Sequence, residues 1–216
     1  MNLEKQIEEF LNLLSEANIL FRGGVGLYLE ENAHGERFQS RLQQLQLHER
    51  ELDILSRFIE AHLRAQPIVP ELRGDVLQLL EQLSRLQRLL AKNLEEFEAE
   101  CPNIPTEMHG RFNELCHFVS MAVGTCVEAG HIFFHETEKV GEYLSKVAFY
   151  EKEADKRVLG LVKSTFSHPN LSLAEKIHIR RFVDKVDEPA NKAEEIAAWL
   201  AIFFLKRAPL YPVISQ

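Results

Sequence analysis

Two carboxylates one helical turn apart occupy positions where a core residue is expected. Glu151 and Asp155 have the spacing Glu-x-x-x-Asp. On a helical wheel at about 100° per residue, they fall near the middle of an apolar arc, away from Lys152 and Lys156. Ionised carboxylates are rarely buried without a partner, because their desolvation is costly. The sequence therefore predicts that a base, a shared proton or a metal ion neutralises these two groups.

The same spacing occurs earlier in the chain. Glu49 and Asp53 also lie within an apolar arc, and the two motifs start 102 residues apart. Each motif is followed by a proline-bearing loop and then by another long helical pattern. One such motif carries little information, because solvated helix faces often contain it. Two copies at matched positions indicate an internal duplication of about half the chain.

The last helical segment offers oxygen ligands at the same height as the second motif. In an antiparallel pair with its turn near residue 170, Asp155 faces residues 185–187 and Glu151 faces about residue 189. The side chains expected there on one helix face are Asp184, Asp187, Asn191 and Glu194. Such a cluster favours hard or borderline cations: iron, manganese, magnesium or zinc. A solvated acidic groove with raised pKa values is the plainer alternative.

In the first half, arginine side chains are expected to neutralise the two carboxylates. The same counting places Ser84 opposite Asp53 and Arg88 opposite Glu49, with Arg85 adjacent. A guanidinium can pair with a carboxylate and needs no metal. We therefore expect metal in the second half, with Glu49 and Asp53 as less favoured ligands in the first.

Two features of the helices bear on the position of the acids. Pro189 lies inside the last helix, where it should free the carbonyl of Lys185 and bend the helix beside the acids. The Gly23-Gly24 pair could break the first helix or allow close packing of another. Neither glycine belongs to a phosphate-binding loop, because the required spacing and the preceding strand are missing.

Every long segment of the chain has a helical period, which predicts an all-α fold. The expected helices cover 2–32, 35–65, 71–100, 105–134, 138–167 and 171–207. Their short connections predict antiparallel neighbours. We expect two tandem, pseudo-repeated three-helix bundles, residues 1–102 and 103–216, joined in one rigid, elongated unit.

Composition narrows the range of functions. The net charge of −8 argues against nucleic acid as a partner, because nucleic acids select basic surfaces. The N-terminus is polar and acidic and has no secretory signal pattern. Three cysteines without a Cys-x-x-Cys spacing are typical of reduced thiols in a cytoplasmic protein.

These motifs resemble those of the PhoU-like regulators of phosphate transport, and most closely the branch that accompanies Pit-type phosphate permeases. The most specific stretches are Leu47–Asp53 with Arg73–Asp75, and Tyr150–Asp155 with Val183–Glu195. The resemblance implies a six-helix PhoU-like architecture and a cytoplasmic protein at the inner face of the membrane. Its implied partner is a phosphate permease or an associated signalling protein. Peripheral membrane association and homo-oligomers fit the same expectation, as does metal binding through the acidic motifs.

An enzymatic alternative comes from Glu128 and His131, which form a Glu-x-x-His motif with His135 one turn later. Ferritin-like di-metal carboxylate oxidoreductases need two such motifs and two further glutamates. The chain contains one, so Glu128 is expected to be at most a peripheral metal ligand. We therefore predict a non-enzymatic regulator, with the oxidoreductase as the alternative and a metal-free helical adaptor as a third interpretation.

Overall fold

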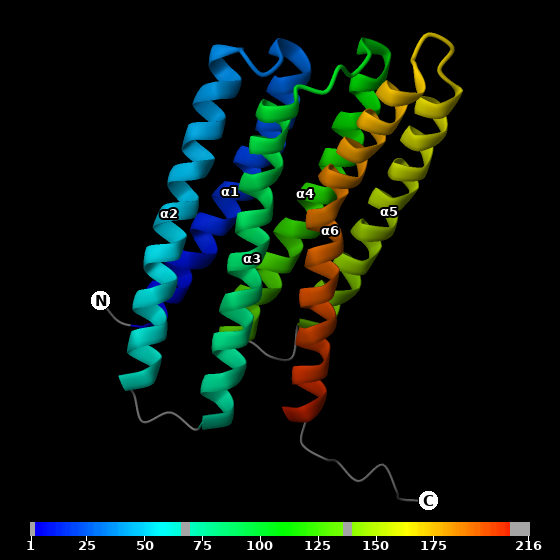
Figure 1. Cartoon of the computed structure of the whole chain (residues 1–216). Coiled ribbons are helices and arrows are strands. Elements are labelled where there is room, and N and C mark those ends of the chain that lie inside the picture. Colours follow the sequence, from blue (N-terminus) through cyan, green and yellow to red (C-terminus); the bar gives the residue numbers. More distant parts are fainter. Residues whose placement is uncertain (1–2, 66–69, 136–139, 208–216) are drawn as a thin grey trace, which may run out of the picture.

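Six long α-helices make up almost all of the residues that the structure, a computed structural model, describes: 3–65, 70–135 and 140–207 (Figure 1). The helices are α1 (Leu3–Glu31), α2 (Glu36–Ala65), α3 (Pro70–Glu100), α4 (Thr106–His135), α5 (Val140–Ser167) and α6 (Leu173–Arg207). These ranges contain no strand. The all-α prediction is confirmed, and the described helix ends lie within a few residues of the expected ones.

Several helix ends have a clear local cause. Asn32 and Cys101 adopt left-handed backbone conformations, with φ of 64° and 46°, at the ends of α1 and α3. Asn is one of the residues that tolerate this conformation at a helix C-terminus. At the start of α6, Ser172 and Glu175 form a capping box in which each side chain accepts a hydrogen bond from the backbone N–H of the other. The expected breaks at 67–69 and 136–137 lie outside the described residues.

The helices form two layers (Figure 1). In one layer α2, α3, α6 and α5 lie side by side, and α1 and α4 pack behind them. Consecutive helices are antiparallel, and α2 and α5 lie at opposite edges of this layer. The Glu-x-x-x-Asp motifs therefore belong to two edge helices, each of which packs against one inner helix of the same layer, α3 or α6.

The two expected halves share a continuous hydrophobic core. Buried residues from all six helices form one cluster, and α1 contacts α4 while α3 contacts α6. Across the α1–α4 contact, Asn18 Nδ2 donates a hydrogen bond to Ser120 O at 2.9 Å. The division into 1–102 and 103–216 stays a prediction, to be tested by superposing the two helix trios.

The glycine pair in α1 serves helix packing, because α1 runs without a break through Gly23 and Gly24. A Cβ added to Gly24 would lie 2.4 Å from Leu94 Cδ1 of α3. Leu94 is completely buried, so the absence of a side chain at Gly24 allows α1 and α3 to approach closely. The α1 break considered from the sequence therefore does not occur.

Helix α4 is the most apolar of the helices. Over Thr106–Phe133 it is long and apolar enough, by length and composition, to cross a membrane. In the fold, however, it packs against α1, α5 and α6. Its buried side chains include Phe112, Val119 and Val127. The hydrophobicity of α4 is accounted for by its position in the core.

Candidate functional site

The second acidic motif lies on the side of α5 that meets α6. Glu151 is only 7% exposed and follows the buried Val147 by one turn, so it occupies a core position as predicted. Asp155 differs, because its side chain is exposed. It lines a groove between α5 and α6 together with Asp184, the apolar side chains of Val158, Leu159 and Val162, and the basic side chains of Lys156 and Arg180. The motif therefore supplies one buried and one solvent-facing carboxyl group.

Helix α6 supplies the facing acids. Asp187 is 7% exposed, and its Oδ2 accepts a hydrogen bond of 2.7 Å from Asn191 Nδ2. Asp184 is exposed at the rim and lies 3.6 Å from Arg180. Glu194 is half-buried two turns beyond Asp187. The helical spacing expected from the sequence thus brings carboxylates of α5 and α6 to the same level.

Burial and the charges of nearby acids raise the pKa values of Glu151 and Asp187. Burial raises the pKa of Glu151 to about 7, and the nearby charges of Asp155, Glu194 and Asp187 add to this increase. Burial likewise raises the pKa of Asp187 to about 6. The hydrogen bond from Asn191 opposes that increase, and the charges of Asp155 and Asp184 reinforce it. Glu151 and Asp187 are therefore harder to ionise than ordinary carboxyl groups.

The nearby lysines do not neutralise this cluster. Lys185 Nζ lies 3.3 Å from Glu96 of α3 and 3.2 Å from Glu188. Lys192 pairs with Glu195 at 2.7 Å. In the described part of the chain, no lysine or arginine forms an ion pair with Glu151 or Asp187. Both lysines are instead paired with glutamates outside the cluster.

The donor set fits a cation that prefers oxygen ligands. Carboxylates from Glu151, Asp155, Asp187 and Glu194 influence one another electrostatically, and Asn191 adds an amide oxygen. Among the described residues, however, no group of three or more His, Cys, Asp or Glu side chains is arranged closely enough to hold a metal ion. Metal binding here would require side-chain rotation, which the exposed Asp155 can make without disturbing the core.

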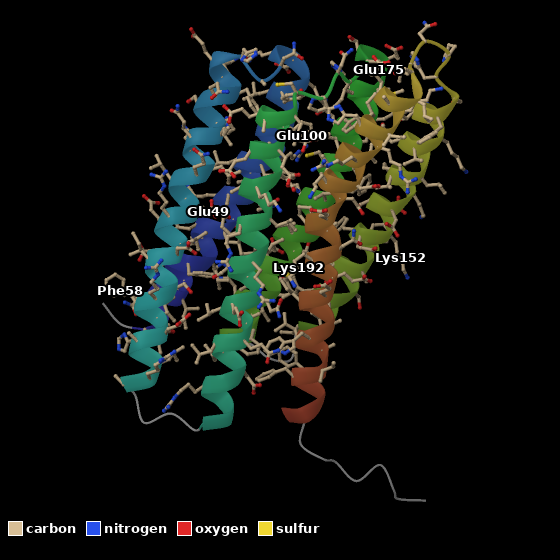
Figure 2. All side chains as sticks on the ribbon, viewed as in Figure 1. Glu49, Phe58, Glu100, Lys152, Glu175 and Lys192 are labelled. Carbon is tan, nitrogen blue, oxygen red and sulfur yellow. The ribbon has the colours of Figure 1, made fainter. Side chains whose placement is uncertain are left out.

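The corresponding groove of the first half contains its own cation. Arg88 of α3 lies 3.2 Å from Asp53, and the two side chains are 45% and 40% exposed. The ion pair thus joins Arg88 to Asp53 rather than to Glu49, one turn away from the expected register. Glu49, which is labelled in Figure 2, is half-buried on α2. Burial and the charges of Glu95 and Asp53 raise its pKa, while Arg88 lowers it.

The other first-half positions also differ from a metal site. Ser84 is buried, its Oγ has no hydrogen-bond partner in the structure, and it shares a groove with Asp53 and Arg88. Arg85 pairs with Glu81 at 2.6 Å on its own helix. Arg88 is thus the side chain that pairs with Asp53, and Arg57 lines the same groove.

Pro189 frees the backbone carbonyl of Lys185, as predicted, whereas the bend expected in α6 stays a prediction. It lies inside α6 and has no N–H to donate to the carbonyl of Lys185. Asn93 of α3, which is completely buried, donates a hydrogen bond from Nδ2 to that carbonyl at 2.5 Å. The sequence identified the freed carbonyl, and the structure identifies the donor that satisfies it, two residues before Asp187.

Some predicted residues do not join the cluster. Glu128 is exposed on α4 and is not among the groups that raise the pKa of Glu151. His131 lies half-buried on the same helix, and the side chain of His135 lies outside the described residues. Sequence reasoning also missed Glu95 beside Glu49. The only signal for Glu95 was its place on α3, two turns beyond Arg88.

Taken together, the fold and the site define a six-helix bundle whose two edge helices carry acidic motifs. The first motif is paired with Arg88, and the carboxylates of the second form no ion pair with lysine or arginine in the described residues. No family model matches the sequence. Over 180 residues, or 83% of each chain, it is 23% identical to a UPF0111 protein of Thermotoga maritima. It is also 23% identical to a UPF0111 protein of Pyrococcus horikoshii over 205 residues, or 94% of each chain.

Two solved structures from Shewanella oneidensis have the same fold. A PhoU-like protein matches with a TM-score of 0.84 and 17% identity, covering 95% of this chain and all of that one. A second, described as a PhoU-like phosphate regulatory protein, matches with a TM-score of 0.81 and 17% identity, covering 96% of this chain and all of that one. The chain therefore has the PhoU-like fold, as its motifs predicted.

Proposed function

We propose that this chain is a regulator or accessory protein of inorganic phosphate transport. It acts by contact with a phosphate permease, of the Pit type, or with an associated signalling protein. It works in the cytoplasm at the inner face of the membrane, and it does not catalyse a reaction. The acidic cluster of α5 and α6 binds a metal ion that stabilises the contact-competent form.

The fold supports the first part of this proposal. Both Shewanella structures match nearly the whole chain, and one is described as a phosphate regulatory protein. The observation that carries the second part is the pair of buried carboxyl groups, Glu151 and Asp187, with no basic partner in the described chain. A buried carboxylate needs a counter-charge, and oxygen-rich clusters suit iron, manganese, magnesium or zinc.

The oxidoreductase alternative is less well supported by the geometry. A ferritin-like centre requires ligands from facing helices of one core. Glu128, from the Glu-x-x-His motif, is exposed on α4 and lies outside the α5–α6 cluster. A regulatory role makes no such demand on α4.

Phosphate uptake by intact cells tests the regulatory role. Cells that lack this chain should take up radiolabelled phosphate at a rate different from that of cells that contain it. Affinity purification from membranes should recover the permease with the wild-type chain. An unchanged uptake rate, together with no permease in the purified material, would refute the proposed role.

Elemental analysis of protein purified without chelator tests the metal proposal. Asp155→Ala and Asp187→Asn should reduce the metal content, and Asp53→Ala should leave it unchanged, because Arg88 already occupies the first-half groove. Equal loss in the Asp53 and Asp155 variants would show that both halves bind metal. Absence of metal from the wild-type protein, even after incubation with manganese or iron, would leave the cluster as a solvated acidic groove.

A further inference from the structure

The outer face of α2 carries an apolar stripe that no part of the described chain covers. Leu47, Ile54 and Phe58 are 53%, 55% and 61% exposed, and Ala61 and Ala65 continue the stripe at helical spacing. Figure 2 labels Phe58 at the outer edge of the molecule. Exposed apolar residues are common singly, but a continuous stripe marks an interaction surface.

The two flanks of this stripe carry opposite charges. On the side toward α3, Arg50, Arg57 and Arg64 recur every seven residues and are exposed. Neither Arg50 nor Arg57 forms an ion pair in the described chain. On the side toward α1, the exposed acids are Glu51 of α2 and Glu9 and Glu16 of α1.

The contacts between α1 and α2 set the heights of these charges. Glu16 Oε2 lies 2.9 Å from His48 Nε2, which places Glu16 near the level of Arg50. Gln6 Oε1 lies 3.1 Å from His62 Nδ1. Because the helices are antiparallel, residue 9 then lies near the level of Arg57. Arg50 and Arg57 therefore each have an acid at a similar height on the opposite flank.

We propose that this face of α2 binds a second copy of the same chain, with the two α2 helices parallel about a two-fold axis. In that arrangement each residue meets its counterpart at the same height, and the arginine row of one copy faces the acidic row of the other on both sides. An antiparallel pairing would instead place arginine against arginine and acid against acid, which is unfavourable. The charge pattern thus selects both the partner and the orientation.

The pseudo-equivalent helix α5 lacks this self-complementarity. A shift of 102 residues places Phe149 at the position of Leu47, but Lys156 and Lys163 at the positions of Ile54 and Ala61. Phe149 is 57% exposed, similar to Phe58. A stripe with lysines at its centre would repel its own copy, so α5 provides a matched control surface. This proposal does not depend on the proposed role in phosphate transport.

Sedimentation velocity of the full chain over a range of concentrations tests the proposal. The wild type should sediment as a dimer, and Phe58→Glu should raise its dissociation constant by at least about a hundredfold. Phe149→Glu should leave it unchanged. Arg57→Glu should also weaken the dimer, and adding Glu9→Arg to that variant should restore it. Circular dichroism verifies that each variant is folded.

Disulfide trapping tests the orientation independently. In a Cys101→Ser background, Ile54→Cys should form a disulfide-linked dimer on mild oxidation, because the two copies of residue 54 face each other. In a mixture of Leu47→Cys and Phe58→Cys chains, cross-links should join two copies of the same variant and should rarely join Leu47→Cys to Phe58→Cys, whereas antiparallel helices would favour that mixed pair. A wild type that is monomeric throughout, or a dimer broken by Phe149→Glu and not by Phe58→Glu, would overturn the proposal.

Discussion

Asn93 of α3 donates a hydrogen bond of 2.5 Å to the backbone carbonyl of Lys185 in α6, which Pro189 deprives of its usual helical partner. The contact joins two helices that are far apart in the sequence but adjacent in one layer. It satisfies a polar group that would otherwise be buried and unpaired. The hydrogen bond also holds α6 against α3 close to the acidic cluster, because Asp187 lies two residues after Lys185.

Removal of this hydrogen bond should destabilise the protein, and removal of the proline should compensate. We expect Asn93→Leu to lower the free energy of unfolding by about 1–3 kcal/mol, the cost of an unsatisfied buried carbonyl. In the Asn93→Leu background, Pro189→Ala restores a backbone N–H donor and should recover part of the loss. Urea denaturation of the four proteins gives the coupling energy. Strictly additive effects would mean that Asn93 stabilises the fold by another route.

The buried carboxyl groups should make stability fall as pH rises. The pKa of Glu151 is about 7 in the folded protein, above its ordinary value of 4.5. Between these values the folded state retains a proton that the unfolded chain has released, so stability decreases through this window and the full penalty applies above pH 7. Asp187 adds the same trend between 3.8 and about 6. This trend is expected for protein kept free of metal with a chelator.

Glu151→Gln should therefore raise the melting temperature near pH 8 and change it little near pH 4. The amide has a similar shape to the protonated acid and cannot ionise. Glu153→Gln is the matched control, since the pKa of Glu153 is lowered by hydrogen bonds from Lys156 and Arg157. A gain from Glu151→Gln that does not depend on pH would contradict an ionisation penalty at this position.

The ion pair of the first half should contribute little to stability. Arg88 and Asp53 are both more than one-third exposed, and exposed pairs contribute roughly 0–1 kcal/mol. We expect Arg88→Ala to cost less than about 1 kcal/mol, with a similarly small coupling to Asp53→Asn in a double-mutant cycle. Arg88→Ala should have a clearer effect on Glu49, because Arg88 lowers the pKa of Glu49 and loss of the guanidinium should let that pKa rise further. Carboxyl carbon NMR titration measures that pKa, and an unchanged value would exclude the influence of Arg88.

The close packing of α1 and α3 predicts opposite outcomes for two neighbouring glycines. Gly24→Ala would place a Cβ 2.4 Å from Leu94 Cδ1, and such overpacking typically costs about 1–3 kcal/mol. Gly26→Ala meets only Asn113 Oδ1 at 3.6 Å, an ordinary contact. It should stabilise the helix by about 0.5–1 kcal/mol, because alanine is the better helix former. Thermal unfolding compares the two variants, and stabilisation by both would contradict the packing role of Gly24.

The sequence alone determined the helices and the positions of their acids. A period of 3.6 residues, interrupted by proline, glycine and capping residues, is a local property, so all six helices could be predicted from it. The same periodicity placed Glu151 at a buried position, and counting from the turn near residue 170 placed Asp187 level with Asp155. The loss of the helical hydrogen bond to Lys185 also followed locally, from the chemistry of Pro189.

Only the tertiary structure decided which side chains meet. Arg88 pairs with Asp53 rather than Glu49, because the register between α2 and α3 depends on packing along their whole length and on a turn that sequence counting places only approximately. Asp155 is exposed although it shares the apolar arc of Glu151, because α6 covers only part of that arc. The Asn93 contact with Lys185 depends on the meeting of α3 and α6 across the two halves, which no local pattern encodes.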